Sequence, residues 1–366
     1  MKVLHIIPDL GTGGAEMVVL TYLRKSKALP DIEMSLVSLS SNQGRLYERM
    51  IDAEGLPVTY LGQNINDNSI KARISQILQI RRVIKGQSPD VLHIHLSILW
   101  MICVATIGLG IRGVFHTLHS DPSKTSYGKH RYIDKWCYRL FHVRPICLNN
   151  EMCDIANRIF DRHDALPLPN GIDLELYHCD CRKEYRKLFG ISEDSFVVGH
   201  VGRFIKVKNH PLIIRSFAEL KKIRPNAKLV LVGEGGDMDK IQEQCKDLKI
   251  DKDVIFTGAR ADVPQLMRMF DVFIFPSLYE GLGIVLIEAQ AAGLRCVVSK
   301  HIPQEAFVTD HVSVIDDDTN YKMWAQALNE ETYPSVKPLM KLQDYSTSHV
   351  MNKLKDYYKQ SLEKNE

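Results

Sequence analysis

The chain has 366 residues, of which 45% are hydrophobic and 25% are charged, close to the averages of globular proteins. This composition excludes a disordered, collagen-like or coiled-coil chain, and the length predicts two or three domains. The net charge of +3 gives no reason to expect nucleic-acid binding. Residues 1–172 carry 20 basic and 15 acidic side chains, an excess that fits either an anionic partner or ordinary solvated surface.

The first half of the chain alternates predicted strands and helices. The apolar stretches predict strands at 3–7, 34–39, 91–95, 114–118 and 146–148, and the periodic stretches predict helices at 15–25, 69–85, 96–109 and 150–160. The apolar run 96–111 is shorter than the roughly 20 residues of a membrane-spanning helix and contains two glycines, so we expect a buried helix there. No signal peptide is expected, because residues 3–7 run straight into a glycine-rich turn.

A turn-rich stretch at 166–173 predicts a domain boundary, and a second series of strands and helices follows it. Strands are predicted at 196–201, 228–232, 254–256, 272–275 and 296–299, and helices at 211–222, 238–248, 263–269, 284–292 and 347–362. The sequence therefore predicts two doubly wound α/β domains, 1–172 and 173–346, that face a cleft, with a final helix 347–366 packing back on the first domain. Ligands of such sheets bind beyond the carboxyl ends of the strands.

The eight cysteines are irregularly spaced and include no C-x-x-C pair, which argues against a zinc ribbon or a thioredoxin motif. We expect reduced thiols and a cytoplasmic location. Cys179 and Cys181 are the one close pair, and a metal site there is a minor alternative.

The most specific motif lies at 276–289, where a predicted strand, a glycine-containing loop and a predicted helix follow one another. Gly281 and Gly283 let the backbone approach a ligand, and the helix N-terminus favours an anion such as pyrophosphate. Glu280 and Glu288 are eight residues apart, and carboxylates suit the hydroxyl groups of a sugar better than they suit a phosphate.

With this motif the chain resembles the retaining glycosyltransferases of family 4, which have the GT-B fold and an E-x7-E signature. The resemblance extends over nearly the whole chain, and Arg295 departs from the proline usual in the family. It implies that Glu280 contacts the donor sugar and that Glu288 binds the nucleotide ribose. It also implies that the stretch of Gly281, Leu282, Gly283 and Ile284 contributes to donor binding.

A second loop, at 199–210, contains the pattern G-R-x4-K. Arg203 and Lys208 follow a predicted strand, and two cations at its tip would hold a diphosphate and stabilise its charge as the glycosidic bond breaks. This pattern resembles the diphosphate clamp of the family, whereas an ordinary charged surface loop is the alternative. We interpret Lys206 as an ordinary surface residue. Gly258 and Arg260 lie in a loop that flanks the nucleobase in relatives.

Two loops of the first domain complete the predicted site. Gly13 and Gly14 belong to a loop that resembles the family's first glycine-rich loop, although the pattern is not the G-x-G-x-x-G of a dinucleotide oxidoreductase. By resemblance His119 faces the donor sugar, whereas His116 is expected to point into packing. His93 and His95 have the H-x-H spacing of metal ligands, but no third ligand is evident, so we assign no metal.

The surface that binds the acceptor is predicted from the distribution of charge. Residues 124–144 contain six basic side chains and one acidic side chain, interleaved with Tyr132, Trp136, Tyr138 and Phe141. A basic, aromatic helix of this kind lies on an anionic membrane, or else it is a solvated face with a buried stripe. Together with the basic helix at 71–85, the segment suggests a lipid-linked acceptor and peripheral contact with the inner face of the cell membrane.

The sequence therefore predicts a retaining glycosyltransferase that uses Glu280, His119, Arg203 and Lys208 in catalysis. We expect a nucleotide-diphosphate sugar, with UDP as the nucleotide, as co-substrate, and no other cofactor. The overall resemblance is to bacterial enzymes of capsular and extracellular polysaccharide synthesis. Two alternatives stay open, namely a nucleotide-sugar 2-epimerase of the same fold and a non-catalytic partner subunit.

Overall fold

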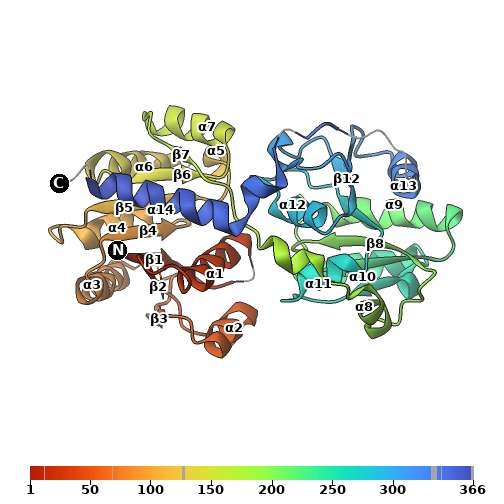
Figure 1. Ribbon diagram of the computed structural model, residues 1–366, viewed down its shortest axis with the longest axis horizontal. Helices are drawn as coiled ribbons and strands as arrows, with labels where there is room; N and C mark the ends of the chain where they lie inside the picture. Colours follow the sequence, from red (N-terminus) through yellow and green to blue (C-terminus); the bar gives the residue numbers. More distant parts are fainter. Residues whose placement is uncertain (12, 68, 126–127, 331–335, 339, 364–366) are drawn as a thin grey trace. The chain divides into compact units, whose positions relative to one another are not determined.

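The computed structural model describes the chain except for residues 12, 68, 126–127, 331–335, 339 and 364–366 (Figure 1). The chain forms two compact units, which we call unit 1 and unit 2. Unit 1 consists of Met1–Gly171 together with Tyr345–Glu366, and unit 2 consists of Ile172–Asp344. Each unit is an α/β structure built on one parallel sheet.

The sheet of unit 1 has seven strands in the order β3-β2-β1-β4-β5-β6-β7. Its strands are β1 (Lys2–Ile7), β2 (Glu33–Ser38), β3 (Val58–Tyr60), β4 (Val91–His95), β5 (Gly113–Leu118), β6 (Arg144–Cys147) and β7 (Leu166–Pro167). Its helices are α1 (Gly14–Ser26), α2 (Leu46–Glu54), α3 (Ile70–Gln87), α4 (Leu99–Thr106), α5 (Pro122–Thr125), α6 (Gly128–Leu140), α7 (Asn150–Phe160) and α14 (Thr347–Glu363). The strand order reverses between β1 and β4, which makes their carboxyl ends the ligand-binding edge.

The sheet of unit 2 has six strands in the order β10-β9-β8-β11-β12-β13. They are β8 (Phe196–Val201), β9 (Ala227–Val232), β10 (Val254–Phe256), β11 (Val272–Phe275), β12 (Arg295–Ser299) and β13 (Val312–Ile315). The helices are α8 (Arg182–Leu188), α9 (His210–Ile223), α10 (Met238–Asp247), α11 (Val263–Arg268), α12 (Ile284–Ala291) and α13 (Tyr321–Asn329). The strand order reverses between β8 and β11.

The central strands are buried because helices cover both faces of each sheet. All four residues of β11 are buried, as are the last five residues of β1. In unit 2, strands β8 and β9 share one apolar core with helices α9 and α13. The carboxyl ends of these rigid strands therefore carry the loops whose side chains concern function.

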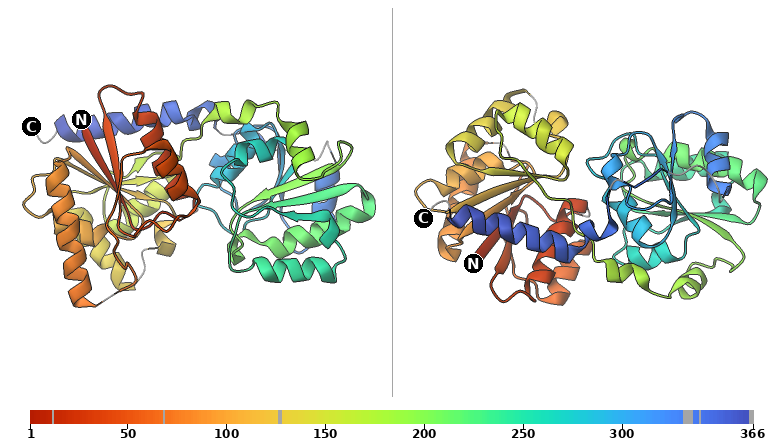
Figure 2. Two further views of the ribbon diagram at one scale, coloured as in Figure 1. Left: turned by 90° about the horizontal axis from the view of Figure 1, so that it is seen from below. Right: turned by 45° about the horizontal axis from the view of Figure 1, so that its top comes forward.

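Helix α14 belongs to unit 1 although it is the last helix of the chain (Figures 1 and 2). Its residues Val350, Leu354 and Tyr358 lie in the same apolar core as residues of β1, β4 and β5. The Tyr357 hydroxyl donates a hydrogen bond to the carbonyl of Pro167 (2.9 Å). The helix thus completes the covering of the first sheet.

The structure shortens one predicted helix and adds elements that the sequence pattern did not reveal. The apolar run forms α4, which begins at Leu99 because Leu96 adopts a left-handed φ of 61° that ends the preceding strand. Among the described helices, none combines the length and the apolar character that a bilayer crossing requires. The elements not predicted include short strands and short helices, namely α2, β3, α5, β7, α8, β13 and α13.

Candidate functional site

Three glycine-containing loops meet at the carboxyl ends of β8, β9 and β10. The Gly233 amide donates a hydrogen bond to the carbonyl of Gly258 (2.9 Å). Gly233 and Gly235 have φ angles of +138° and +156°, and a Cβ there would lie 2.2 Å from the Gly202 oxygen and 2.4 Å from the Phe204 oxygen, respectively. Only glycine fits such positions, so the loop after β8 is held directly against the loop after β9.

Lys208 and Glu280 lie in contact where the strand order of unit 2 reverses. The Lys208 Nζ is 2.5 Å from the Glu280 Oε1, and their side chains are only 16% and 14% exposed. The Lys208 Nζ also lies 5.0 Å from the centre of the Phe275 ring. The Leu278 amide donates to the carbonyl of Val207 (2.9 Å), which ties the loop after β11 to the loop after β8. The structure thus brings together two predicted site residues that are 72 positions apart.

Arg203 and Lys206 lie in the same loop and are both exposed. Within the described part of the chain, the Arg203 side chain makes no ion pair, so its guanidinium is available to a ligand. Lys206 begins the short 3-10 turn Lys206–Lys208 that sets the position of Lys208. The loop therefore offers one exposed cation and one paired cation at the end of β8.

The N-terminus of α12 lies beside this pair. Gly283 is the residue before the helix and has a φ of +82°, and a Cβ there would lie 3.3 Å from the Phe275 ring. Leu282 is buried, whereas Gly281 and Ile284 are partly exposed. The glycine conformation lets the chain turn from β11 into the helix, whose N-terminal amide groups face the edge of the sheet.

Glu288 lies one turn inside α12 and accepts a hydrogen bond from the Tyr177 hydroxyl. The residue as a whole is partly exposed, but protein atoms surround its carboxyl group. Burial raises the pKa of Glu288 to about 7, and the bond from Tyr177 opposes part of this rise. Tyr177 is 4% exposed and lies in the 3-10 turn Leu174–His178. No sequence pattern pointed to Tyr177.

Arg260 does not join the Lys208 and Glu280 pair. Its guanidinium binds both carboxylate oxygens of Asp262 (2.8 and 2.6 Å), and Asp262 also accepts from the Tyr185 hydroxyl (2.9 Å). Arg260 follows β10, which is separated from β8 by β9. Gly258 is nearer, since its carbonyl binds Gly233. The structure therefore gives Arg260 a local partner, which the sequence did not reveal.

In unit 1, Gly13, Gly14 and His119 follow strands at the equivalent edge of the sheet. Gly13 precedes α1, and a Cβ there would lie 2.6 Å from the Glu16 carboxylate. The His119 Nε2 lies 3.0 Å from the His95 Nδ1, and burial lowers the pKa of His119 to about 3. His119 is therefore a neutral imidazole at physiological pH. His116 is buried and hydrogen-bonds the Tyr138 hydroxyl and the Leu96 carbonyl, as expected of a packing residue.

The structure supplies a third histidine to the H-x-H pair, which the sequence reasoning missed. One ring nitrogen each of His5, His93 and His95 lies within 4.8 Å of the others. Both nitrogens of His93 are already engaged, at 2.5 Å from the Tyr358 hydroxyl and 2.6 Å from the Thr117 hydroxyl. This cluster of described residues contains no carboxylate to balance a cation. The arrangement therefore fits hydrogen bonding better than it fits a metal ion.

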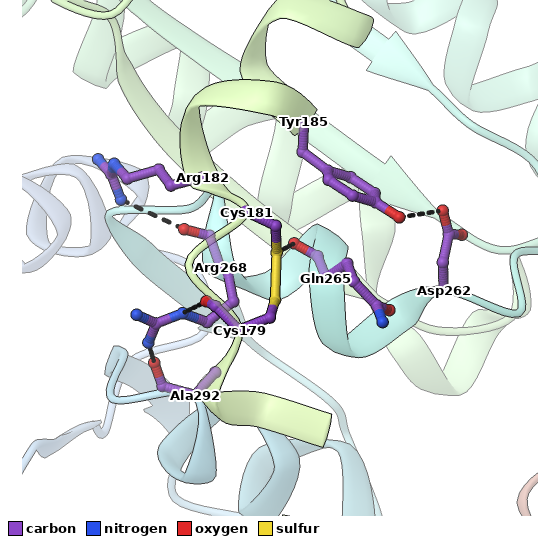
Figure 3. Close-up of a disulfide and its surroundings, with 8 residues drawn as sticks. All are labelled: Cys179, Cys181, Arg182, Tyr185, Asp262, Gln265, Arg268 and Ala292. Atoms are coloured by element: carbon purple, nitrogen blue, oxygen red, sulfur yellow. Dashed lines mark hydrogen bonds between the residues drawn. A yellow bond between two sulfur atoms is a disulfide. The ribbon is translucent and has the colours of Figure 1, made fainter. Parts of the chain in front are cut away.

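The expectation of reduced thiols is wrong at one pair, because Cys179 and Cys181 form a disulfide (Figure 3). The Arg268 Nε donates to the carbonyl of Cys179 (3.1 Å), and its Nη1 donates to the carbonyl of Ala292 (2.7 Å). A disulfide leaves no thiolate at this pair, so the metal alternative fails there as well. The other six cysteines are free and buried.

Comparison with known proteins gives consistent matches over both units. A model described as "Glycosyltransferase Family 4" matches residues 12–176, and a model described as "Glycosyl transferases group 1" matches residues 182–331. The chain is 30% identical over 318 residues to the Bacillus subtilis (strain 168) protein named "Putative glycosyltransferase EpsF", covering 83% of this chain and 80% of that protein.

A second relative is the Escherichia coli UDP-Gal:alpha-D-GlcNAc-diphosphoundecaprenol alpha-1,3-galactosyltransferase. It is 29% identical over 295 residues, which cover 76% of this chain and 74% of that enzyme. Among solved structures, Anabaena HepE in complex with UDP and glucose superposes with a TM-score of 0.80 at 17% identity, over 98% of this chain and all of that chain. At this identity the structural match concerns the fold.

Proposed function

Because the chain belongs to family 4 of the glycosyltransferases and has the GT-B fold, we propose that it transfers a sugar from a nucleotide-diphosphate sugar to an acceptor hydroxyl with retention of anomeric configuration. The observation that carries this proposal is the Lys208 and Glu280 contact at the reversal of strand order in unit 2. A cation and a carboxylate there match the two parts of such a donor, its diphosphate and its sugar hydroxyls.

The roles proposed for these groups rest on the family resemblance, and their positions support them. Arg203 and Lys208 bind the diphosphate, with the N-terminus of α12 beside them. Glu280 accepts hydrogen bonds from the sugar, and Glu288 accepts them from the ribose. His119 of unit 1 hydrogen-bonds a hydroxyl group of the sugar, a role that rests on the family resemblance.

In the proposed reaction, the bond between the anomeric carbon and the diphosphate oxygen breaks, and a bond from the same carbon to the acceptor oxygen forms on the same face. The acceptor proton passes to the leaving phosphate oxygen. Lys208 stabilises the charge that develops on the diphosphate. Glu280 is held by Lys208, which suits a carboxylate that binds rather than one that forms a covalent intermediate.

UDP is the proposed nucleotide, since the Escherichia coli relative is named for UDP-Gal and HepE was solved with UDP. A thermal-shift panel of nucleotides and nucleotide sugars tests this choice. Incubation with the best donor, with and without lipid extract, then separates the candidate activities. Transfer that requires an acceptor supports the proposal, whereas an epimerised donor formed without an acceptor overturns it.

The proposed acceptor is a saccharide linked to a lipid. The relatives named for diphosphoundecaprenol substrates support this class of acceptor. In unit 1, α6 exposes four apolar side chains at helical spacing, namely Tyr132, Ile133, Trp136 and Leu140. Helix α3 exposes Ile70, Ile74 and Leu78, and α4 packs against both α3 and α6 (Figure 1). These exposed apolar groups lie among basic residues, as on a surface that binds an anionic membrane.

Two basic residues of the segment 124–144 interact with other residues of unit 1. Arg144 lies on β6 with its guanidinium 5.9 Å from the centre of the Phe115 ring, and Lys135 pairs with Asp161 (3.4 Å). Arg131 and Arg139 of α6 are exposed. Lys129 is described only as part of the α6 backbone. The proposed membrane contact therefore depends on Arg131, Arg139 and the exposed apolar side chains.

Replacing Arg131 and Arg139 together by glutamate is expected to weaken binding to vesicles that contain phosphatidylglycerol by about tenfold or more, since each basic residue near such a surface contributes about 1 kcal/mol. Vesicle co-sedimentation measures the effect. The matched control replaces Lys246 and Lys249, two exposed lysines of unit 2, by glutamate. Equal binding of both variants would remove the support for this surface.

Replacing Glu280 by glutamine is expected to lower the turnover of the identified donor by about 100-fold, the scale of losing one group that stabilises the transition state. Glutamine keeps the size of the side chain but loses the negative charge. The carboxylate that pairs with Lys208 and accepts hydrogen bonds from the sugar hydroxyls is then absent. Glu219→Gln is the control, because Glu219 pairs with Lys222 on the surface of the same unit. Unchanged turnover in Glu280→Gln would exclude the assigned role.

We place this activity in the synthesis of bacterial surface polysaccharide, of the capsular or extracellular type, at the cytoplasmic face of the membrane. The named acceptors of the relatives and the exposed surface of α3 and α6 support this placement. Transfer activity that co-sediments with membranes and extends a lipid-linked saccharide tests it, and transfer only to soluble acceptors would contradict it.

A further inference from the structure

The Cys179–Cys181 disulfide differs from the disulfides that stabilise a fold. Its two cysteines are two positions apart, so the bond spans Asp180 alone. The stabilisation that a disulfide gives by restricting the unfolded chain grows with the length of the closed loop, so it is smallest in a case like this. Both cysteines are partly exposed, whereas the six free cysteines are buried. Exposed disulfides are the ones that exchange readily with thiols.

A positive charge lies beside this pair of cysteines. The Arg268 Nε donates to the carbonyl of Cys179 (3.1 Å), and within the described part of the chain Arg268 pairs with no carboxylate. Asp180 is exposed, so water screens its charge. A cation next to a cysteine favours the thiolate, which is the form in which a sulfur leaves when a disulfide opens. The Gln265 carbonyl oxygen lies 4.0 Å from the Cys181 Sγ and is available to a thiol there.

The disulfide also lies beside the residues that hold Glu288. Cys179 directly follows the 3-10 turn that contains Tyr177, whose hydroxyl donates to the Glu288 carboxyl group. The Arg268 guanidinium donates to the carbonyls of both Cys179 and Ala292 (Figure 3). Ala292 is the residue directly after α12, the helix that carries Glu288. The segment around the disulfide is therefore linked to this helix at two points.

We propose that the bond between Cys179 and Cys181 is a reversible redox site, which cellular thiols open. The closed bond restricts the backbone next to Tyr177 and so keeps the Tyr177 hydroxyl on the Glu288 carboxyl group. The consequence for nucleotide binding rests on the proposed function, whereas the redox site and its link to Glu288 do not. The proposed cytoplasmic placement agrees with such a site, because disulfides of cytosolic proteins are usually transient or redox-sensing.

The bond opens by thiol–disulfide exchange. A thiolate of the reductant attacks one sulfur of the pair, the S–S bond breaks, and the other sulfur leaves as a thiolate that takes up a proton. A second thiol of the reductant then attacks the mixed disulfide and releases the first sulfur. Two electrons and two protons pass from the two thiols to the protein, and the two thiols become a disulfide. A disulfide of the same class closes the bond again by the reverse steps.

Alkylation of the intact chain under native conditions, followed by mass spectrometry, tests the redox site. The tryptic peptide 163–182 contains both cysteines and no other. Most copies of this peptide should carry two alkyl groups after equilibration with a glutathione buffer of cytosolic composition, and none after equilibration with glutathione disulfide. The six buried cysteines should stay unmodified in both, which shows that the chain remains folded. A pair that is mostly closed in the reducing buffer, or mostly open in the oxidising one, would overturn the proposal.

Carbon-13 NMR of the glutamate carboxyl groups tests the link to Glu288, and Glu288→Gln assigns its signal. The hydrogen bond from Tyr177 lowers the pKa of Glu288, so opening the disulfide should raise that pKa above its closed value of about 7. Tyr177→Phe lacks the hydroxyl, so its Glu288 pKa should already be raised and should not respond to reduction. No response in the wild type, or an equal response in Tyr177→Phe, would overturn the link.

Cys179→Ser combined with Cys181→Ser gives a chain that stays open. Titration calorimetry should show UDP binding about tenfold weaker than in the closed wild type, because one hydrogen bond to a charged group contributes roughly this much. Cys245→Ser, which removes a buried free cysteine of unit 2, is the control and should keep the full response to reduction. Equal affinities of the open and closed chains would exclude an effect on the nucleotide. UDP that binds neither chain would contradict the proposed function, and the Glu288 signal would still decide the redox link.

Discussion

Lys208→Gln is expected to lower the turnover number about 100-fold to 1,000-fold, the largest effect among single substitutions in this chain. As the glycosidic bond breaks, negative charge grows on the leaving diphosphate, and removing one group positioned to stabilise such charge costs this much in other enzymes. Lys208 is held by Glu280 and by the Phe275 ring, so its ammonium group is already in place before the donor binds. Steady-state turnover of the donor identified by the panel measures the effect.

Lys206→Gln is the matched control, because Lys206 lies two residues away in the same turn and is exposed. It removes the same formal charge and should change turnover less than about twofold. Thermal unfolding of both variants shows whether the loss of the partner of Glu280 disturbs unit 2. Similar losses in the two variants would mean that only the general charge of the loop matters, and the proposed clamp would be wrong.

Glu288→Gln is expected to stabilise the chain at neutral and higher pH, although it removes a proposed ligand contact. The Glu288 pKa is about 7 when folded and 4.5 in its ordinary state. Below pH 4.5 the carboxyl group is protonated in both the folded and the unfolded chain, so it does not lower the free energy of unfolding. Between pH 4.5 and 7 the unfolded chain loses the proton first, so the wild type loses stability as the pH rises. Above pH 7 the wild type has lost about 3 kcal/mol of its free energy of unfolding, and the loss does not increase further.

Thermal unfolding of the wild type and Glu288→Gln at pH 5 and pH 8 measures this difference. The variant should gain over the wild type mainly at pH 8, whereas Glu243→Gln, an exposed glutamate of the same unit, should show no such gain. UDP binding should weaken in Glu288→Gln, since the amide replaces a carboxylate proposed to accept from the ribose. A pH-independent difference between wild type and variant would contradict the raised pKa.

The sequence predicted the elements whose apolar pattern is strong and missed those that depend on tertiary packing. Strand β11 is four consecutive apolar residues, and its prediction over 272–275 is confirmed. Strand β3 has three residues, none of them buried, so its pattern is too weak to distinguish from a loop. Arg295, which departs from the family pattern, donates to the carbonyls of Ala327 and Leu328 at the end of α13.

The candidate site shows the same division. Glu280 and Lys208 were predicted from motifs, because each motif follows a strand and the strand order brings their loops together. Tyr177 could not be found, since a lone tyrosine in a turn has no pattern that relates it to Glu288. His5 carried one usable signal, a polar residue within the buried run of β1, but its partner is revealed only by the pairing of β1 with β4.

The return of α14 to unit 1 has a consequence for the order of events during translation. Residues Met1–Gly171 of unit 1 are synthesised before unit 2, yet the apolar core of unit 1 includes Leu354 and Tyr358. Domains usually fold in the order of their synthesis. Here the later segment, Ile172–Asp344, is complete while the earlier one still lacks a helix. Nascent chains that end at residue 344 and are followed by a linker long enough to span the ribosome exit tunnel should therefore resist protease in the second unit and remain susceptible in the first.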